Sequence, residues 1–446
     1  MADISKKIEK LSLAHDSISP ELARKKDIKF GLRNRDGTGV VVGVTTKGKV
    51  EGYTKIDKEG KTDIKPSHGK LFYCGYDVAN LIDEITAEGR FGFEEIIYLL
   101  LAGQLPGKND LKQFNEKLGI KRNLSKAERG IILEEAQTNN QMHDLHFVIS
   151  HMSRSDITPD STDVKDVIRQ CINLIAKFPT IVAYNYHAMK YRKGSDLKMM
   201  RPRPELSAAE NFLYMLKCSM PDSYDARLLD TSLILHAEHG GGNNSTFAVR
   251  TVSSSGANTY MAIASGIASL SGQFHGGANQ YVMQMMKHLK KNVKDWGNER
   301  AITKYLQRLL DGKVNNVSGK IYGLGHAVYT LSDPRAVILK KQAEEYSKMK
   351  GLEREFQLYN IVEKIGTKLI SERKRIKICV NVDFYSGFLY KMLGIPPEIY
   401  TPMFAMARVA GWSAHRIEQL IQGKIMRPAY MSLSDKERKY KNIKER

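Results

Sequence analysis

The sequence predicts an all-α protein that carries a short β-hairpin segment near its N-terminus. From Gly75 onward, apolar residues recur at the three- and four-residue spacing of helices that bury one face. The chain has 13 prolines, and most of them stand between these helical patterns instead of interrupting them. Residues 37–45, by contrast, are rich in β-branched side chains, which favour strands.

Length and composition are those of a globular protein. The chain has 446 residues, which at roughly 100–200 residues per domain suggests two or three domains. Hydrophobic residues make up 42% and charged residues 26%, so the chain is not expected to be disordered. The longest apolar run, residues 96–102, is far shorter than the ~20 residues of a membrane helix, and the N-terminus lacks an apolar signal core. We therefore expect a cytoplasmic protein that does not enter the membrane.

The N-terminal elements differ from the rest. Residues 1–30 predict a charged amphipathic helix followed by a linker. Residues 31–65 predict two or three short strands, with turns at Lys47-Gly48 and at Lys58-Glu59-Gly60. We expect these strands to form the hairpin that precedes the helical body.

The helical body begins with two clear patterns. Val78, Leu81, Ile82 and Ile85 predict its first helix, and the second covers residues 96–101 and stops before Gly103. No fixed-period repeat is present, so a solenoid is not expected.

The net charge of +20 raises the question of an anionic partner. Basic proteins bind nucleic acid, acidic lipid or small anions. The basic residues are spread along the chain, with a denser cluster at 436–446, and aromatic residues are not interleaved with them as a stacking platform for bases requires. A lysine-rich solvated surface explains the charge, and we expect no nucleic-acid partner.

The four cysteines do not form a recognisable framework. They are scattered along the chain and include no Cys-x-x-Cys pair, which is typical of reduced thiols in an intracellular protein. Their positions are Cys74, Cys171, Cys218 and Cys379.

The segment 322–336 combines a histidine with an arginine. His326 stands in a glycine-flanked bend, where the backbone can approach a ligand closely. Arg335 follows an Asp-Pro turn, and a guanidinium held by a rigid turn is well suited to bind a carboxylate. A titratable group beside such a clamp indicates chemistry on a small anion.

Two histidines, His236 and His239, end an apolar helical pattern in the run His-Ala-Glu-His-Gly-Gly-Gly. Residues three apart share a helix face, so a metal site is conceivable. The metalloprotease order His-Glu-x-x-His is absent and no third ligand is evident. The alternative is one histidine at the helix end and one packed in the core.

A third histidine, His275, stands between two apolar helical patterns and is followed by two glycines. A histidine near a helix N-terminus has a lowered pKa, and the neutral imidazole can donate a hydrogen bond to a developing enolate. The alternative is a loop histidine at a helix junction.

An aspartate and two further arginines lie in apolar surroundings. Burial beside Val382 and Phe384 would raise the pKa of Asp383 and make it a better base, although the residue could also simply cap a helix. Arg408 lies in an apolar helix, where an unpaired charge is costly. Either arginine could instead lie at the surface with only its aliphatic part buried, and this alternative fits Arg427 better than Arg408.

Together these residues are three histidines, one aspartate and three arginines, in a chain without a P-loop, a dinucleotide-binding fingerprint or a metal motif. Proton abstraction from carbon and binding of a dicarboxylate need residues of these types.

Taken in order, these segments resemble citrate synthases, and the bacterial type most closely. The resemblance rests on the segments 236–246, 253–258, 275–279, 323–328, 333–336, 381–387 and 405–408, and it continues upstream through 209–215, 178–183 and 73–76. It therefore covers nearly everything after residue 70. Two departures are Ala327, where many bacterial relatives have a basic residue, and Cys74, which replaces an arginine common before the Gly-Tyr pair.

The resemblance implies an acyltransferase that condenses acetyl-CoA with oxaloacetate and water, giving citrate and CoA, without a metal or redox cofactor. It implies that Asp383 removes the acetyl methyl proton and that His275 donates a hydrogen bond to the thioester oxygen. His326 would bind and protonate the oxaloacetate carbonyl. The oxaloacetate-binding residues implied are His239, Arg335, Arg408 and Arg427.

The resemblance also implies a homodimer in which Arg427 acts in the neighbouring subunit's site. Its large domain would comprise residues 71–276 and 388–446 and its small domain residues 277–387, after an N-terminal helix and hairpin segment at 1–70. The domains would close over the substrates at Gly276-Gly277 and Gly387.

Two other functions remain open at this point. A 2-methylcitrate synthase would use propionyl-CoA with the same catalytic residues, and one methylene changes binding by only ~1–3 kcal/mol. A non-catalytic basic protein would instead use its C-terminal tail on nucleic acid.

Overall fold

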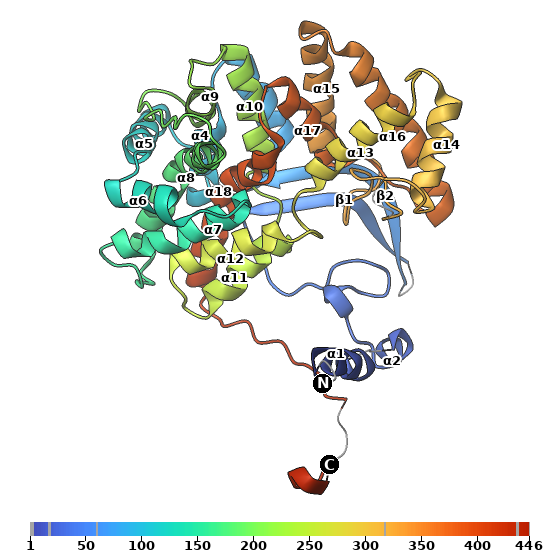
Figure 1. Ribbon diagram of the computed structural model, residues 1–446. Helices are drawn as coiled ribbons and strands as arrows, with labels where there is room; N and C mark the ends of the chain where they lie inside the picture. Colours follow the sequence, from blue (N-terminus) through green and yellow to red (C-terminus); the bar gives the residue numbers. More distant parts are fainter. Residues whose placement is uncertain (1–3, 17–18, 59–60, 316–317, 434–436, 446) are drawn as a thin grey trace.

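The structure is a computed structural model of the chain that describes residues 4–16, 19–58, 61–315, 318–433 and 437–445. Over these ranges the protein is mainly helical, which confirms the predicted fold class (Figure 1). None of the helices in these ranges has the length and apolar character that crossing a bilayer requires. In chain order the helices are α1 (Ile4–His15), α2 (Pro20–Lys25), α3 (Val78–Ala87), α4 (Phe93–Ala102), α5 (Lys108–Lys121), α6 (Lys126–Gly130), α7 (Gln141–His151), α8 (Val164–Arg192), α9 (Ala208–Lys217), α10 (Ser223–His236), α11 (Asn244–Ser254), α12 (Thr259–Ser271), α13 (Ala278–Asn292), α14 (Glu299–Leu310), α15 (Pro334–Met349), α16 (Glu353–Lys374), α17 (Val382–Met392) and α18 (Tyr400–Gln422).

The only sheet in the described ranges is a small antiparallel one, with strands β1 (Gly48–Lys58), β2 (Lys61–Tyr73) and β3 (Tyr76–Asp77). Strands β1 and β2 form a long hairpin in which Gly48 pairs with Tyr73 and Lys58 with Lys61. Glu59 and Gly60 of the predicted turn lie outside the described residues. The hairpin itself is confirmed, but it is longer and lies further along the chain than the sequence predicts.

The β-branched residues 37–45 do not form a strand, which corrects the prediction for this segment. The one bridge here is between Arg33 and Gly39. Side chains of the helical body take the place of a strand partner: the Arg250 guanidinium donates to the Val44 carbonyl, and the Glu418 carboxylate accepts from the Thr46 backbone N–H. The segment is therefore an extended strap that crosses the body.

Helix α18 is the centre of the larger group of helices, on the left in Figure 1. It packs against α4, α8, α10, α11 and α12 and is buried on all sides for most of its length. A helix that is apolar around its whole circumference is expected in the interior. Even three of its ionisable side chains, those of Arg408, His415 and Arg416, are fully buried.

A second group consists of α13 to α17, on the right in Figure 1, and the hairpin reaches towards it. Helices α13 and α15 pack on α17, and α14 and α15 pack on α16. Strand β2 contacts α15. The hairpin thus connects the N-terminal region to the loop that precedes α15.

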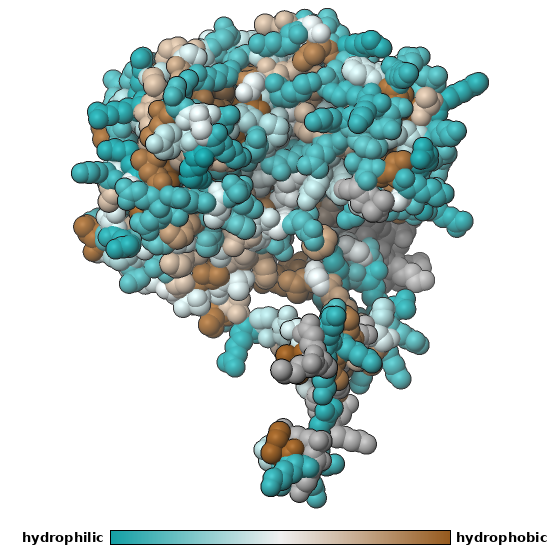
Figure 2. Space-filling view, viewed as in Figure 1, coloured by the Kyte–Doolittle hydropathy of each residue, from teal (hydrophilic) through white to brown (hydrophobic). Residues whose placement is uncertain are grey.

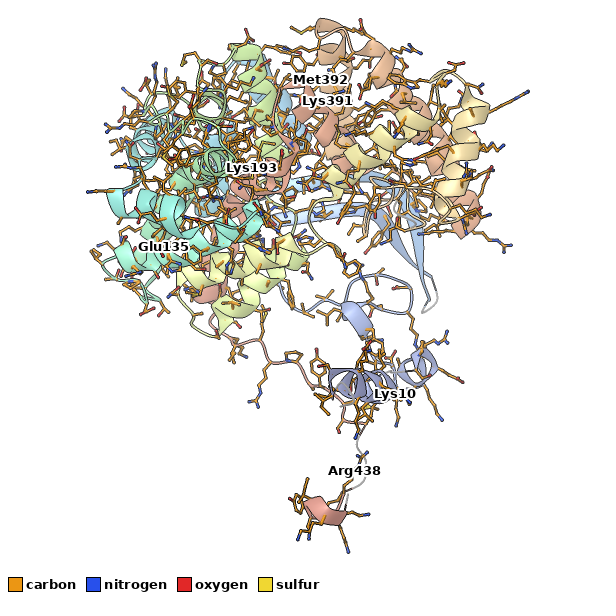
Figure 3. The ribbon with its side chains drawn as sticks, viewed as in Figure 1. Lys10, Glu135, Lys193, Lys391, Met392 and Arg438 are labelled. Atoms are coloured by element: carbon orange, nitrogen blue, oxygen red, sulfur yellow. The ribbon has the colours of Figure 1, made fainter. Side chains whose placement is uncertain are left out.

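The N-terminal helices and the C-terminal segment extend away from this body. Lys10 on α1 and Arg438 near the C-terminus both lie on these arms, outside the packed helices (Figure 3). Polar side chains cover most of the face seen in Figure 2, whereas both arms carry apolar ones. On the arms, the exposed apolar residues include Ile4, Ile8, Leu11, Ile425, Tyr430 and Met431.

Candidate active site

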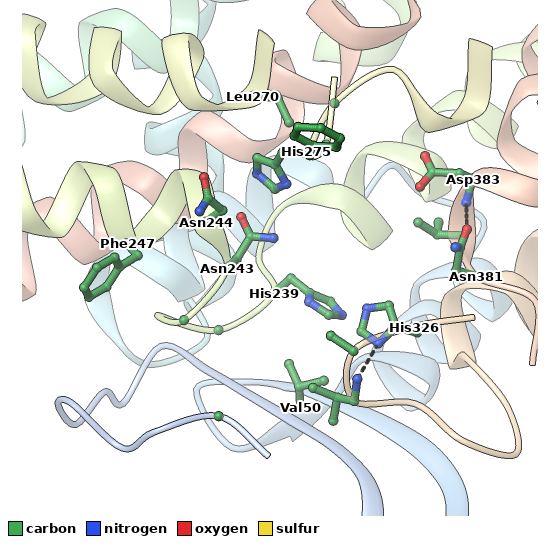
Figure 4. Close-up of a pocket in the computed structure, with 18 of the residues that line it drawn as sticks. Val50, His239, Asn243, Asn244, Phe247, Leu270, His275, His326, Asn381 and Asp383 are labelled. Atoms are coloured by element: carbon green, nitrogen blue, oxygen red, sulfur yellow. Dashed lines mark hydrogen bonds between the residues drawn. The ribbon is translucent and has the colours of Figure 1, made fainter. Parts of the chain in front are cut away.

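A pocket of about 780 Å³ lies where the two helical groups and the N-terminal segment meet. Its walls come from residues 31–42 of the N-terminal segment, from strand β1, from the loops at 239–244, 274–277 and 325–328, and from the starts of α13 and α17 together with α18. His239, His275, His326 and Asp383 all face this space from different elements (Figure 4). The pocket therefore brings together four candidate residues that span 144 positions of the sequence, from His239 to Asp383.

His326 lies in the glycine-flanked bend that the sequence predicts. Its Nδ1 accepts hydrogen bonds from the backbone N–H groups of Val328, at 3.0 Å, and Tyr329, at 3.1 Å. Because a backbone N–H can only donate, Nδ1 carries no proton and the neutral ring must carry it on Nε2. Burial, reinforced by the positive charge of Arg335, lowers the pKa of His326 to about 4. At neutral pH the ring is an uncharged donor.

His275 lies in the loop between α12 and α13, as predicted, and has the opposite tautomer. Its Nε2 accepts from the backbone N–H of Ser245 at 3.2 Å, so the proton is on Nδ1. Burial and, secondarily, the charge of Arg408 lower the pKa of His275 to about 4. The pocket therefore has two neutral imidazoles whose proton positions are set by the backbone.

Asp383 lies in the first turn of α17, with Asn381 as the residue that caps the helix. The Asn381 side chain accepts from the Asp383 backbone N–H at 3.0 Å, so the alternative in which Asp383 itself is the cap is wrong. Burial raises the pKa of the Asp383 carboxyl to about 6, against the opposing effect of Arg335. A carboxylate with a raised pKa is a stronger base than an exposed one.

Arg335 is held by Asp333, the residue that caps the start of α15. The sequence suggests an Asp-Pro turn here; instead, Asp333 is the N-cap and Pro334 the first residue of the helix. Two hydrogen bonds, of 3.0 and 2.7 Å, join the Arg335 Nε and Nη2 atoms to the two Asp333 carboxylate oxygens. Asp333 raises the pKa of Arg335 despite its burial, so the guanidinium stays charged at the pocket.

Asp333 has a second function that sequence patterns did not reveal. Its Oδ2 also accepts from the backbone N–H of Val382 at 3.1 Å. One buried carboxylate therefore connects the start of α15, which carries Arg335, to the start of α17, which carries Asp383. No spacing in the sequence indicates this link, because the two segments are about fifty residues apart.

Arg408 is fully buried and mostly unpaired. Its Nε donates to the His236 carbonyl at 2.7 Å, but neither Nη1 nor Nη2 has a hydrogen-bond partner among the described residues. Burial lowers the pKa of Arg408 to about 10, with Glu238 as the main opposing charge. A buried cation with free donors in a pocket wall is a site for an anion, and its planar fork suits a carboxylate.

The loop that carries His239 is fixed from behind by Glu238. The Glu238 carboxylate accepts from His415 Nε2 at 2.8 Å and from the backbone N–H of Gly240. His415 Nδ1 in turn lies 2.9 Å from an Arg250 nitrogen. This buried network anchors the turn after α10, so that His239 reaches the pocket while His236 stays in the core.

Two of the singled-out residues do not reach the pocket. His236 is buried at the end of α10 and does not line it. Arg427 is exposed in the segment after α18 and also lies outside it. His236 and His239 do not share a site, and the described residues include no group of three or more histidine, cysteine, aspartate or glutamate residues arranged for a metal ion.

Other residues of the pocket escaped the sequence analysis. Arg33 lines the pocket from the N-terminal segment before the strap, and its charge contributes to the low pKa of His326. Asn243 and Asn244 line it at the start of α11. Arg33 gave no signal because it belongs to no motif or apolar pattern. The two asparagines lie in a segment on which the family resemblance rests, but no role was predicted for them.

The arrangement supports a specific kind of chemistry. A buried carboxylate base faces the same space as two neutral imidazoles, and two buried guanidinium groups supply positive charge. Such a pocket can bind a small dianion, remove a proton from carbon and donate hydrogen bonds to the oxygen atoms that become negative.

The comparisons with known proteins agree with this geometry. The family model described as "Citrate synthase, C-terminal domain" matches residues 46–429. The citrate synthase of Acidithiobacillus ferridurans is 36% identical, over 86% of this chain and 95% of the relative. A 2-methylcitrate synthase 1 of Corynebacterium glutamicum is 32% identical, over 87% of this chain and 95% of the relative.

Solved structures that resemble this chain are also citrate synthases. The citrate synthase of Thermotoga maritima MSB8 has a TM-score of 0.74 at 30% identity, over 94% of this chain and 99% of that chain. The citrate synthase of Thermoplasma acidophilum, solved as a ternary complex with carboxymethyl coenzyme A and oxaloacetate, has a TM-score of 0.76 at 26% identity, over 94% of this chain and 99% of that chain.

Proposed function

The chain belongs to the citrate synthase family, which condenses acetyl-CoA with oxaloacetate and water to citrate and CoA, and we propose that Asp383, His275 and His326 catalyse this reaction. The observation that supports these roles most directly is the pair of fixed tautomers. Backbone N–H groups occupy one nitrogen of each histidine, so each ring keeps its proton for the pocket.

The first step is removal of a proton from the acetyl methyl group. The Asp383 carboxylate takes this proton while the Nδ1–H of His275 donates a hydrogen bond to the thioester oxygen. A thioester α-proton is a weak acid, so a carboxylate needs this simultaneous stabilisation of the enolate oxygen to remove it quickly. Both histidine and carboxyl are buried, which strengthens the hydrogen bond.

The second step forms the carbon–carbon bond. The enolate carbon attacks the oxaloacetate ketone carbon, and the Nε2–H of His326 supplies the proton that the ketone oxygen needs as it becomes a hydroxyl. Water then cleaves the thioester of the citryl-CoA intermediate and releases citrate and CoA. The steps are a proton abstraction, an aldol-type addition and a thioester hydrolysis, and none of them needs an external oxidant or reductant, so we propose that no metal or redox cofactor takes part.

The arginines position the dicarboxylate. We propose that Arg335 and Arg408 each bind a carboxylate of oxaloacetate and that His239 supplies a further donor. The free Nη atoms of Arg408 support this role, because an unpaired buried cation gains most from an anionic ligand. Holding the ketone against the enolate also removes the entropic cost of bringing the two together. Arg33 adds positive charge at the pocket's edge, where the anionic acyl-CoA would enter.

We propose that the chain acts as a homodimer and that Arg427 completes the site of the neighbouring subunit. Arg427 is exposed and does not line the pocket of its own chain. It lies in the segment after α18, which runs away from the helical body (Figure 1). The exposed apolar residues of both arms also suit a partner surface. The four cysteines are unpaired, which is consistent with a cytoplasmic location.

We further propose two domains that close over the substrates, a large one of residues 71–276 and 388–446 and a small one of residues 277–387, after the N-terminal segment 1–70. Gly276 and Gly277 connect α12 to α13, and Gly277 has a φ of 75°, which only glycine adopts readily. A Cβ on Gly276 would lie 1.8 Å from the Leu270 carbonyl oxygen, so the connection has no room for a side chain.

The choice of acyl-CoA tests the function directly. With oxaloacetate present, we expect kcat/KM for acetyl-CoA to exceed that for propionyl-CoA by roughly tenfold or more, because one extra methylene in a fitted pocket costs ~1–3 kcal/mol. Release of the CoA thiol, followed with a thiol-reactive dye, measures both. A preference for propionyl-CoA would make the chain a 2-methylcitrate synthase, and no release from either would refute the enzyme assignment. A protein that instead bound nucleic acid would show salt-sensitive binding that Asp383 does not affect.

The rate should also depend on pH in a predictable direction. The base must be ionised in the free enzyme, and the pKa of Asp383 is raised to about 6. We therefore expect kcat/KM for acetyl-CoA to be constant well above pH 6 and to fall towards tenfold per pH unit below it. Circular dichroism over the same pH range controls for unfolding. If kcat/KM stayed constant down to pH 4.5, Asp383 would have an ordinary carboxyl pKa and the effect of burial would be refuted.

A further inference from the structure

Tyr329 contacts three of the residues to which oxaloacetate binding is assigned. Its hydroxyl lies 3.2 Å from His239 Nε2, and its ring stacks on His326 with a centroid separation of 4.5 Å. The Arg335 guanidinium lies 5.6 Å from the centre of the same ring. Tyr329 is itself almost fully buried, at 2% exposure. No step of the proposed mechanism uses this residue.

We propose that Tyr329 is a positioning residue whose hydroxyl fixes the tautomer of His239, so that His239 presents an N–H to oxaloacetate. This inference rests on the proposed function. Backbone N–H groups determine which ring nitrogen carries the proton in His275 and His326, but not in His239. The inference explains how the proton position of His239 is determined.

The charge state of His239 makes its tautomer matter. Burial, together with the charges of Arg335 and His326, lowers the pKa of His239 well below the ordinary value, so the ring is neutral. A neutral imidazole has one donor and one acceptor nitrogen. If the unprotonated nitrogen of His239 faces a carboxylate of oxaloacetate, the two acceptors repel each other. If the N–H faces the carboxylate, the two groups form a hydrogen bond.

The Tyr329 hydroxyl favours the productive arrangement. It is the only protein partner that the described residues provide for the His239 ring nitrogens. An imidazole nitrogen is a better acceptor than a phenol oxygen, so the hydroxyl donates to Nε2. The proton then lies on Nδ1, the nitrogen that has no protein partner and remains for a ligand at the pocket.

The hairpin fixes the position of Tyr329. A Cβ on Gly69 of β2 would lie 2.5 Å from Tyr329 Cδ1, and one on Gly52 of β1 would lie 2.6 Å from its Cα. The hairpin backbone therefore approaches this residue more closely than any side chain would permit. Thr330 also donates to the Gly52 carbonyl, and the backbone N–H of Gly69 donates to the Ser332 carbonyl at 3.1 Å. Strands β1 and β2 thus seat the loop from which the hydroxyl reaches His239.

The first test is Tyr329→Phe, which removes the hydroxyl and keeps the ring. We expect the dissociation constant of oxaloacetate, measured by titration calorimetry without acyl-CoA, to rise about tenfold. A loss of this size is expected when the hydrogen bond from His239 to oxaloacetate is no longer favoured. KM for oxaloacetate should rise in parallel, with a smaller change in kcat. Unchanged binding would overturn the inference. Failure of the unmodified protein to bind oxaloacetate would instead refute the proposed function.

Tyr305→Phe is the matched control. Tyr305 is also buried, and its hydroxyl lies 2.7 Å from His288 Nδ1, but neither residue lines the pocket. Removing this hydroxyl should leave oxaloacetate binding unchanged. An equal loss in both variants would mean that Tyr329→Phe acts through general stability, which overturns the inference.

A second measurement separates tautomer control from packing. In His239→Asn, the amide nitrogen takes the place of Nδ1. Because an amide nitrogen is always a donor, it donates with or without the Tyr329 hydroxyl. Tyr329→Phe should therefore change oxaloacetate binding less than twofold in this background. A tenfold loss there would overturn the inference. In protein labelled with ¹⁵N-histidine, the His239 signal, assigned from its absence in His239→Asn, should show an unprotonated Nε2 that becomes partly protonated in Tyr329→Phe. A protonated Nε2 in the unmodified protein would equally refute it.

Discussion

Changing Asp383 to asparagine is expected to lower kcat for citrate formation by about 10³-fold while the protein folds and binds oxaloacetate. Asparagine has nearly the same shape, and the cap on α17 is kept because Asn381 accepts from the backbone N–H of residue 383 rather than from its side chain. What is lost is the group that accepts the methyl proton, since a neutral amide is not a base at neutral pH.

The same substitution should not weaken the binding of oxaloacetate, in contrast to its effect on turnover. The Asp383 carboxylate opposes the positive charges of Arg335 and Arg408, as its effects on their pKa values show. Removing this negative charge should leave the affinity for dianionic oxaloacetate unchanged or increase it. Calorimetric titration with oxaloacetate and an assay of CoA release together separate a catalytic defect from a binding defect.

Asp110→Asn is a suitable control for this experiment. Asp110 lies in the first turn of α5, is exposed and does not line the pocket. This variant should retain full turnover. Near-normal turnover in Asp383→Asn would show that another group removes the proton, and a large loss in both variants would point to damage at helix starts in general.

Local sequence patterns were sufficient to find the chemical groups of the site. Each of His275, His326 and Asp383 stands at a boundary that a pattern marks, such as a pair of glycines or the end of an apolar run, and the structure places all three at one pocket. Arg408 was detectable because a charge within an apolar helix needs an explanation. Recognition of the family, which the comparisons confirm, drew on the same segments.

Long-range relations were not predictable in this way. The backbone contacts that fix the two tautomers, such as Ser245 with His275, join segments whose approach depends on the packing of whole helices. The carboxylate of Asp333 connects two helix starts that no periodicity relates. The strap at 37–45 has a strand-like composition, but the body supplies side-chain partners instead of a strand, so propensity alone gave the wrong element.

His326 permits a sharper separation of structure from chemistry, because its two nitrogens have different partners. Nδ1 anchors the loop by accepting from two backbone N–H groups, and Nε2 carries the proton assigned to the ketone oxygen. His326→Ala removes both contributions. In His326→Asn, the side-chain oxygen can replace Nδ1 as the acceptor, so the loop keeps its anchor while the Nε2 proton is absent.

We therefore expect both variants to lose about 10³-fold in kcat, the middle of the range that one acid catalyst contributes, whereas only His326→Ala should also be less stable to heat. CoA release measures the first effect and thermal unfolding the second. His288→Ala is the control, because this histidine lies outside the pocket. If His326→Asn recovered most of the activity lost in His326→Ala, His326 would be a loop anchor, and the proton for the ketone oxygen would have to come from another donor in the pocket.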